Sequence, residues 1–213
     1  VISPALVFMA SSLRRTACTA PQNKPSGNSH FSILEMTKTV NNKVISFGYL
    51  QAPDTDELLR YLLSLNEETT KRFQPHQPTK SEIENFYRHP QQTIGFIARD
   101  TSTHCIIAYA TIRTGYIDHD EQRLLSYGLQ LSKQTDAAFA PSVADNWQGA
   151  GIGKHLLEFI ITELKRKGVQ RIILWGGVQA ANERAIQYYK KSGFIMLGGF
   201  MHNGHNYDML VLI

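Results

Sequence analysis

The sequence predicts a mixed α/β domain in which helices flank a mostly antiparallel central sheet. Two helix-forming stretches come first along the chain, and several short apolar segments separated by brief polar breaks follow them. A strand–helix–strand–helix unit comes last. Short breaks favour antiparallel neighbours, because strands joined by a tight turn run in opposite directions, whereas a helical connection permits a parallel pair.

Composition and charge are those of a globular domain. The chain has 213 residues, which fits one domain plus an appendage, with 42% hydrophobic and 19% charged residues. Of the net charge of +4, three units come from Arg14, Arg15 and Lys24, so the chain from residue 35 onward carries only +1. A domain this balanced lacks the cationic surface that binds a phosphate backbone. No apolar run reaches the ~18 residues that cross a bilayer, so we expect neither nucleic acid nor membrane as a partner.

Residues 1–40 are predicted to form a disordered leader or tail, and residues 41–213 to form the domain. The leader is rich in Ser, Ala, Thr, Pro and Asn and lacks apolar periodicity. Because the chain begins with Val, Met9 or Met36 is a candidate start. An organelle transit peptide is the alternative, since arginine and serine occur before the first acid, Glu35.

The two cysteines, Cys18 and Cys105, form no CxxC pair and no repeated spacing. We therefore expect neither a disulfide framework nor a zinc site built on cysteine. This pattern suits a reducing compartment and predicts a cytoplasmic protein, unless the leader is a genuine transit peptide.

Capping signals predict the first helices. Asp54 followed by Glu57 opens one helix, and Thr79 followed by Glu82 opens a second, which ends at Pro90. Apolar segments predict strands over residues 44–50, 93–99, 105–114, 124–131 and 137–144.

The last third of the chain is expected to contain the strand–helix–strand–helix unit and a hairpin. Residues 153–167 form an amphipathic helix with a basic end, residues 171–175 a buried strand, and residues 182–192 a further helix. Asn203-Gly204 predicts a two-residue turn between the strands of a terminal hairpin.

A glycine-rich turn precedes the helix over residues 153–167. It reads Gln148-Gly149-Ala150-Gly151-Ile152-Gly153. The glycines let the backbone approach a ligand, and the helix start adds positive potential, which suits a pyrophosphate. The nucleoside triphosphate loop does not fit, because His155 stands where it needs Ser or Thr. The dinucleotide fingerprint does not fit either, because Lys154 and Leu156 stand where it needs a third glycine.

What the turn does match is the Q/R-x-x-G-x-G/A signature of the GNAT acyltransferases, at Gln148, Gly151 and Gly153. A later signature of the same superfamily is matched by Asn182-x-x-Ala185-x-x-x-Tyr189-x-Lys191-x-Gly193-Phe194. The chain therefore resembles GNAT N-acetyltransferases over residues 44–213, and residues 137–148 are similar to the bacterial protein-lysine acetyltransferase branch. The resemblance implies two splayed parallel strands, acetyl-CoA as co-substrate and no metal.

The resemblance also implies the residues that bind the cofactor. They are Ser142, Val143, Ala144, Gln148, Gly149, Ala150, Gly151, Ile152, Gly153, Lys154, Asn182 and Tyr189. The pantetheine arm would pair with the backbone near residues 142–144, and the pyrophosphate would sit on the N–H groups of residues 149–154. A backbone N–H close to Val143 would donate a hydrogen bond to the acetyl oxyanion, and Tyr189 would protonate the departing sulfur, with Tyr188 as its rival. Asn182 would bind the pantetheine, cap its helix, or do both.

The general base and the acceptor contacts are less clearly marked. The related branch often carries Glu where this chain has Ala138, so Asp136 or a chain of waters is the candidate base. Phe73 and His76 are candidates for contact with the acceptor, against the alternative of ordinary loop packing.

Together these features imply an enzyme that transfers an acetyl group from acetyl-CoA to a primary amine by direct attack in a ternary complex. The acceptor is a small amine or a protein lysine or amino terminus, and the enzyme is a monomer or a homodimer. The alternative is a non-catalytic acyl-CoA-binding sensor, because the absent Glu at Ala138 is what a chain that had lost its chemistry would show.

Overall fold

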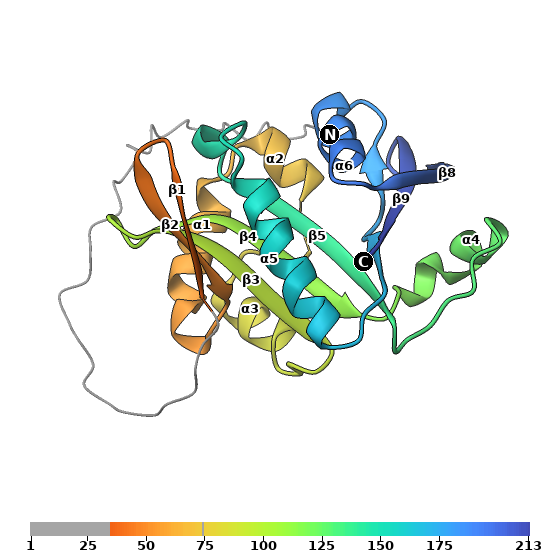
Figure 1. Ribbon diagram of the computed structural model, residues 1–213, viewed down its shortest axis with the longest axis horizontal. Helices are drawn as coiled ribbons and strands as arrows, with labels where there is room; N and C mark the ends of the chain where they lie inside the picture. The colour runs from red at the N-terminus through yellow and green to blue at the C-terminus, as the bar shows by residue number, and fades with distance from the viewer. Residues whose placement is uncertain (1–34, 74) are drawn as a thin grey trace, which may run out of the picture.

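The computed structural model describes residues 35–73 and 75–213, which form a mixed sheet with helices on both faces (Figure 1). The strand order is β1-β2-β3-β4-β5-β6-β9-β7, and β8 pairs with β9. Strands β5 and β6 are parallel, and the other neighbours are antiparallel. The predicted fold class is confirmed.

The strands are β1 (Met36–Val40), β2 (Lys43–Tyr49), β3 (Thr93–Asp100), β4 (Ile106–Thr114), β5 (Asp136–Val143), β6 (Arg171–Leu174), β7 (Val178–Gln179), β8 (Ile195–Met201) and β9 (His205–Leu212). Strand β1 lies before the domain boundary expected at residue 41 and pairs along its whole length with β2. Among the described residues the sheet begins at Met36, and the sequence did not reveal β1 because this strand is short and mostly exposed.

The helices are α1 (Thr55–Ser64), α2 (Glu67–Arg72), α3 (Lys80–Phe86), α4 (Glu121–Ser126), α5 (Ile152–Arg166) and α6 (Glu183–Lys191), with short 3-10 turns η1 (Ala52–Asp54), η2 (Asp118–Asp120) and η3 (Asp145–Trp147). Helix α5 crosses one face of the sheet, and α1 and α3 cover the other (Figure 1). Apolar side chains of α5 pack against β2 to β5 in the main core, and those of α1 and α3 form a second cluster with β4.

Of the two caps predicted for the first helices, one forms as expected and one does not. The Thr79 side chain accepts a hydrogen bond from the Glu82 N–H at 3.3 Å. Asp54 precedes α1 but makes no capping bond. Its carboxylate instead accepts from the Gln51 N–H at 2.8 Å and from Arg99 at 2.7 Å, because the 3-10 turn just before α1 already directs the chain into the helix.

The strand predicted over residues 124–131 is wrong. This segment begins with the second half of α4, which follows directly on η2. Arg123 of α4 bonds to Asp120 at 2.6 Å and to Asp208 of β9 at 2.7 Å, and Leu124 is buried. These tertiary contacts, which local sequence does not reveal, override the apolar run that suggested a strand.

Two further expectations need correction. The terminal hairpin has a three-residue loop between the paired Met201 and His205, with Asn203 and Gly204 both at positive φ (47° and 114°). Cys105, just before β4, is disulfide-bonded, whereas the sequence predicts no disulfide framework, and Cys18 lies outside the described residues.

Candidate active site

The parallel strands β5 and β6 diverge halfway along β5. They pair from Asp136 opposite Arg171 to Phe139 opposite Leu174. The Trp175 N–H then donates to the Phe139 carbonyl at 2.9 Å, and β6 has ended, whereas β5 continues to Val143 with pairing only to β4. A wedge therefore opens between the two strands on the carboxyl-terminal side of Phe139.

The backbone of β5 presents a free amide to this wedge. The Ala144 N–H donates to the Ile107 carbonyl of β4 at 2.9 Å. Because successive peptide groups of a strand point to alternate sides, the N–H of Val143 and the nitrogen of Pro141 face away from β4, toward the wedge. Pro141 thus costs the sheet no hydrogen bond, and Val143 has an N–H available for a ligand.

A cavity lies in the wedge. It is lined by Arg72, Phe73, Phe139, Ala140, Pro141, Leu174, Trp175, Gly177 and Tyr189. These residues come from both diverging strands, the end of α2, the turn after β6 and α6. Gly177 has a φ of +69°, and a Cβ added there would lie 2.6 Å from the Tyr207 carbonyl oxygen, so the turn that forms this wall needs glycine. The structure thus brings Phe73 and Tyr189, two predicted site residues, to one cavity.

The glycine-rich turn follows η3 and leads into α5. Gly149 and Gly151 have φ values of +84° and +86°, a region that glycine adopts without strain. A Cβ at Gly151 would meet no atom within 4 Å, so the space beside the helix start is open. The first four N–H groups of a helix have no partner inside it, which here leaves those of residues 151–154 for a ligand. The Ala150 N–H is the exception in the predicted set, because it donates to the Trp147 carbonyl at 3.3 Å.

Gln148 braces the turn against its neighbours. Its amide nitrogen donates to the Val143 carbonyl and to Asp145, each at 3.2 Å, and its amide oxygen accepts from Arg184 of α6 at 2.9 Å. Arg184 lies over the turn, since a Cβ at Gly149 would be 3.2 Å from its guanidinium. Sequence reasoning missed this residue. The available signal was a cation in the first turn of α6, where the helix dipole favours an acid.

Tyr189 and Tyr188 have different surroundings. Tyr189 is 8% exposed, lines the cavity, and its hydroxyl makes no hydrogen bond to another residue that the structure describes. The Tyr188 hydroxyl donates to the Gly153 carbonyl at 2.9 Å and is held at the start of α5. Burial raises the pKa of Tyr189 well above its ordinary value of 10, so the phenol is protonated at neutral pH. Of the two, Tyr189 has the proton that is free to be given up inside the cavity.

Two further predicted residues, Asn182 and Asp136, are held by hydrogen bonds within the protein. The Asn182 side chain accepts from the Ala185 N–H at 3.2 Å and caps α6. Asp136 is 2% exposed and accepts from Arg171 at 2.9 and 2.6 Å and from the Ser132 N–H at 2.8 Å. It lies at the paired end of β5, so the structure does not bring its carboxylate together with Tyr189.

His76 lies in the loop between α2 and α3, next to the aromatic wall of the cavity. Its ring centroid is 4.7 Å from that of Phe86, which stacks at 6.1 Å on Trp175. His76 itself does not line the cavity.

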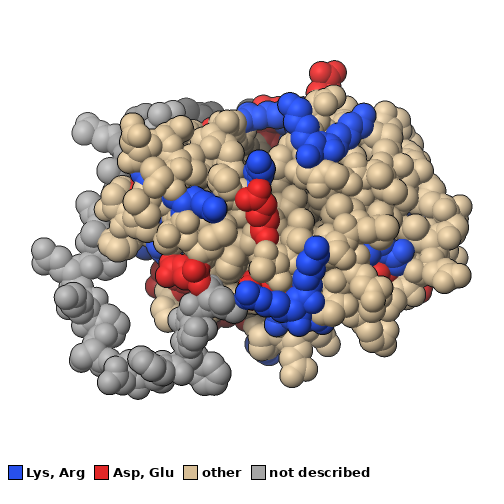
Figure 2. Space-filling model, viewed as in Figure 1, with Lys and Arg blue, Asp and Glu red and all other residues tan. Residues whose placement is uncertain are grey.

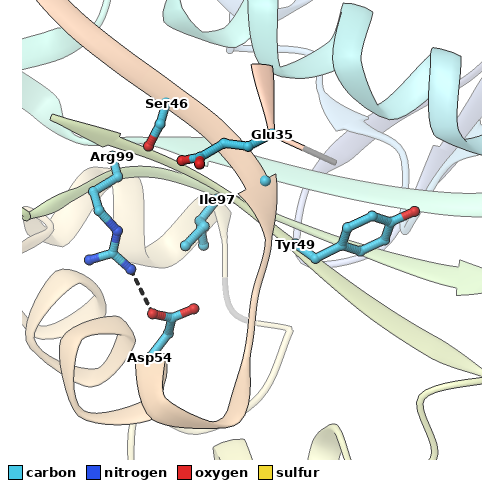
Figure 3. A pocket seen from close by; sticks show the side chains of 7 residues that line it. Glu35, Ser46, Tyr49, Asp54, Ile97 and Arg99 are labelled. Atoms are coloured by element: carbon cyan, nitrogen blue, oxygen red, sulfur yellow. Dashed lines mark hydrogen bonds and ion pairs between the residues drawn. The ribbon is translucent and has the colours of Figure 1, made fainter. Parts of the chain in front are cut away.

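A second cavity lies away from the wedge, on strands β2 and β3 next to η1 (Figure 3). Figure 3 labels Glu35, Ser46, Tyr49, Asp54, Ile97 and Arg99 around it. The guanidinium of Arg99 points at the Asp54 carboxylate, 2.7 Å away, and this ion pair neutralises both charges, which leaves Glu35 as the other charged residue of the lining.

The surface charge agrees with the balanced composition, because both signs occur on the face that α5 covers (Figure 2). Within residues 35–73 and 75–213, no group of three or more His, Cys, Asp or Glu side chains is placed to hold a metal ion. Over the same part of the chain, none of the helices has the length and apolar character needed to span a bilayer.

A mixed sheet whose parallel strands diverge beside a glycine-rich helix start is the architecture of an acyl-CoA-dependent acyltransferase. The chain belongs to the acetyltransferase (GNAT) family, whose sequence model matches residues 59–194. It is an acyltransferase enzyme of that family.

Relatives of known structure share the fold. The GNAT domain of S. lividans PAT is 18% identical, with a TM-score of 0.67 over 84% of this chain and 97% of that one. Spermidine N-acetyltransferase from Vibrio cholerae, solved in complex with CoA and spermine, is 19% identical, with a TM-score of 0.58 over 79% of this chain and 95% of that one.

A relative of named activity is similar in sequence over part of this chain. The [ribosomal protein bS18]-alanine N-acetyltransferase of Salmonella typhimurium is 33% identical over 75 residues. The match covers 35% of this chain and about half (49%) of the relative's length.

Proposed function

We propose that this protein transfers an acetyl group from acetyl-CoA directly to a primary amine within a ternary complex. The observation that carries the proposal is the wedge between β5 and β6, which has the Val143 N–H on one wall and the Tyr189 hydroxyl on another. An acyl thioester placed in that wedge would have a hydrogen-bond donor for its carbonyl oxygen and an acid for its sulfur.

Two parts of the chain would hold acetyl-CoA. The free N–H groups of residues 151–154, the open space at Gly151 and the Arg184 guanidinium suit the pyrophosphate in both charge and shape. The exposed edge of β5 beyond Phe139 suits the pantetheine arm, whose amides would pair with it as an added strand does. Up to Phe139 this edge of β5 is already paired with β6. That pairing would limit how far the thioester can enter between the two strands.

The reaction follows from these positions. The amine nitrogen attacks the thioester carbon, and the carbonyl oxygen takes up negative charge that the Val143 N–H stabilises. Collapse of the tetrahedral intermediate breaks the carbon–sulfur bond, and the sulfur takes the phenolic proton of Tyr189 as it leaves. A buried phenol is protonated at pH 7, so it can supply that proton to a thiolate, whose ordinary pKa is about 8.5.

The acceptor is proposed only as a class. One relative is named for spermidine and another for the alanine of a ribosomal protein, so a small amine and a protein amino terminus are both candidates, as is a protein lysine. The aromatic walls from Phe73 and Trp175 suit the hydrocarbon part of such an acceptor.

The experiment is a turnover screen with the whole chain. Acetyl-CoA is incubated with alkylamines, polyamines, amino acids, aminoglycosides, and peptides with a free alanine amino terminus or an internal lysine, and free CoA thiol is measured. At least one class is expected to release thiol well above the rate without acceptor. Tight binding of acetyl-CoA with no release for any amine would contradict the proposal and favour an acyl-CoA sensor.

A further inference from the structure

A buried chain of hydrogen-bonding side chains lies behind the cavity, on the face of the sheet that α1 and α3 cover. His76 Nε2 is 3.1 Å from the Tyr109 hydroxyl, and the Tyr109 hydroxyl bonds in turn to that of Tyr87. Tyr109 of β4 is fully buried, as is Thr111 two residues along the same strand face. Buried polar chains of this kind are costly unless every member is satisfied, so they call for an explanation.

The direction in which these hydrogen bonds run follows from the two partners of the His76 ring. His76 Nδ1 is 3.1 Å from the Gln77 carbonyl oxygen, which can only accept, so Nδ1 carries a hydrogen. In the neutral ring Nε2 is then an acceptor, and it takes its hydrogen bond from Tyr109. The oxygen of Tyr109 is left to accept from Tyr87. Each hydroxyl therefore donates toward His76.

Thr111, at the opposite end of these side chains from His76, comes close to the cavity. Thr111 Oγ1 is buried and makes no hydrogen bond of ordinary geometry to the residues that the structure describes. It lies close enough to the Tyr87 and Tyr109 hydroxyls to act on both as a hydrogen-bonding neighbour, which opposes the rise that burial causes in the pKa of each phenol. Thr111 pairs directly with Ala140 across β4 and β5, and Ala140 lines the cavity. Side chains of directly opposed residues lie on the same face with Cβ atoms about 5 Å apart, so the Thr111 side chain lies beside a residue that lines the cavity.

The wall of the cavity also contacts these hydrogen-bonded side chains at a second point. Phe73, which lines the cavity, meets the ring of Tyr109 edge to face at 5.6 Å. The phenol chain is thus one layer of side chains behind the acceptor wall.

A primary amine is an ammonium at pH 7 and must lose a proton before it attacks. Ala138 has no group to take it, and the carboxylate of Asp136 is held by Arg171 at the far end of β5. We propose that the proton leaves the cavity through Thr111, Tyr87 and Tyr109 and is accepted by His76. This inference rests on the proposed function.

The proton count balances. The ammonium, or a water bonded to it, gives one proton to the Thr111 hydroxyl, and each hydroxyl in turn passes one proton on. His76 Nε2 gains the proton of Tyr109, so the net change is a neutral amine and an imidazolium. Burial lowers the pKa of His76 below its ordinary 6.5, against a smaller opposing effect of the Gln77 carbonyl and of Glu82 on α3, so the ring is uncharged and ready to accept at pH 7.

The test compares His76→Gln with His89→Gln, since His89 is exposed and its side chain serves as a matched control. Two acceptors with the same carbon skeleton are used, an alkylamine and the corresponding O-alkylhydroxylamine, which is uncharged at pH 7 and needs no base. His76→Gln is expected to lower kcat for the alkylamine by roughly 10²-fold and to leave the uncharged nucleophile within about threefold. Acetyl-CoA affinity, measured by calorimetry, is expected to stay the same in both variants.

The pH profile is a second measurement that needs only the alkylamine. Wild-type kcat is expected to fall on the acid side as His76 becomes protonated, with an apparent pKa below 6.5, and His76→Gln is expected to lose that limb. Tyr109→Phe should lower kcat as much as His76→Gln, and the double variant should be no slower than either.

The outcomes separate the two proposals. If wild-type protein releases no thiol with any amine, the proposed function fails and the relay with it. If wild-type protein turns over and His76→Gln keeps its rate and its acid limb, the relay alone is overturned. A loss of rate that is equal for the charged and the uncharged nucleophile would also overturn it, because it would show that His76 only supports the wall.

Discussion

Arg171 binds Asp136 through two hydrogen bonds of 2.9 and 2.6 Å, and this pair fastens β5 to β6 at the end opposite to their divergence. The carboxylate is 2% exposed and the guanidinium side chain 14% exposed. The pair holds the closed end of the wedge, so its removal tests both the fold and the hypothesis that Asp136 is the base.

Arg171→Met should lower the free energy of unfolding by about 3 kcal/mol, because it leaves a buried carboxylate without its cation. Lys71→Ala, which breaks an exposed ion pair with Glu67, should cost less than about 1 kcal/mol. Chemical denaturation of both variants measures the difference. Equal stability of the two would show that the buried pair does not anchor the strands.

Asp136→Asn addresses the catalytic hypothesis. The structure places this carboxylate away from the cavity, so turnover per folded molecule is expected to stay within about threefold of wild type. A loss of roughly 10²-fold with unchanged acetyl-CoA binding would instead support Asp136 as the base.

Tyr189→Phe removes the phenolic proton and keeps the packing of the ring. We expect kcat to fall by roughly 10²-fold while the Kd for acetyl-CoA changes less than threefold, since the hydroxyl acts on the leaving sulfur. Tyr188→Phe is the control, because its hydroxyl is bonded to the Gly153 carbonyl and not to the reacting atoms. Steady-state kinetics and calorimetry provide the two quantities, and an unchanged kcat in Tyr189→Phe would reject the acid role.

Gly151→Glu should abolish acetyl-CoA binding. The side chain brings a negative charge into the space that the pyrophosphate is proposed to fill, and the φ of +86° adds backbone strain. Gly128→Glu is a matched control, with a φ of +78° and equally open surroundings outside the cavity. Calorimetry should find the wild-type Kd in the control. Binding by Gly151→Glu with the wild-type Kd would contradict the proposed anion site.

Arg184→Ala should raise the Kd for acetyl-CoA by about tenfold, since a charge-assisted hydrogen bond contributes roughly 1.5–3 kcal/mol. The effect should shrink as salt is added, because the guanidinium is exposed to solvent. Lys190→Ala, at the other end of α6, removes an exposed cation that is not beside the turn and should leave the Kd unchanged. Equal effects of the two substitutions would mean that Arg184 contributes only to general surface charge.

Much of the fold could be predicted from the sequence because its signals are local. The glycine turn, the caps at Thr79 and Asn182 and the amphipathic α5 depend on neighbouring residues, and the structure contains them. Strand β1 and helix α4 were missed for the opposite reason. Their positions depend on partners such as β2 and Asp208, which lie elsewhere in the chain.

The candidate site likewise contains some residues that the sequence predicts and others that it does not. Residues of the glycine turn and Tyr189 follow from signatures in the sequence, and these assignments remain predictions for the experiments above. Arg184 and the chain from Thr111 to His76 do not follow from any signature, because they are defined by contacts between α6 and the turn, and between the loop after α2 and β4.

The hydrogen bond from Arg123 to Asp208 fastens the long connection between β4 and β5, which contains α4, to the last hairpin. Asp208 is 1% exposed and also accepts from Tyr127 at 3.1 Å, while Phe200 of β8 stacks under the same guanidinium at 3.7 Å. Outward movement of the hairpin would therefore have to lift α4 as well, so one arginine makes two segments that lie 85 residues apart in the sequence move as a unit.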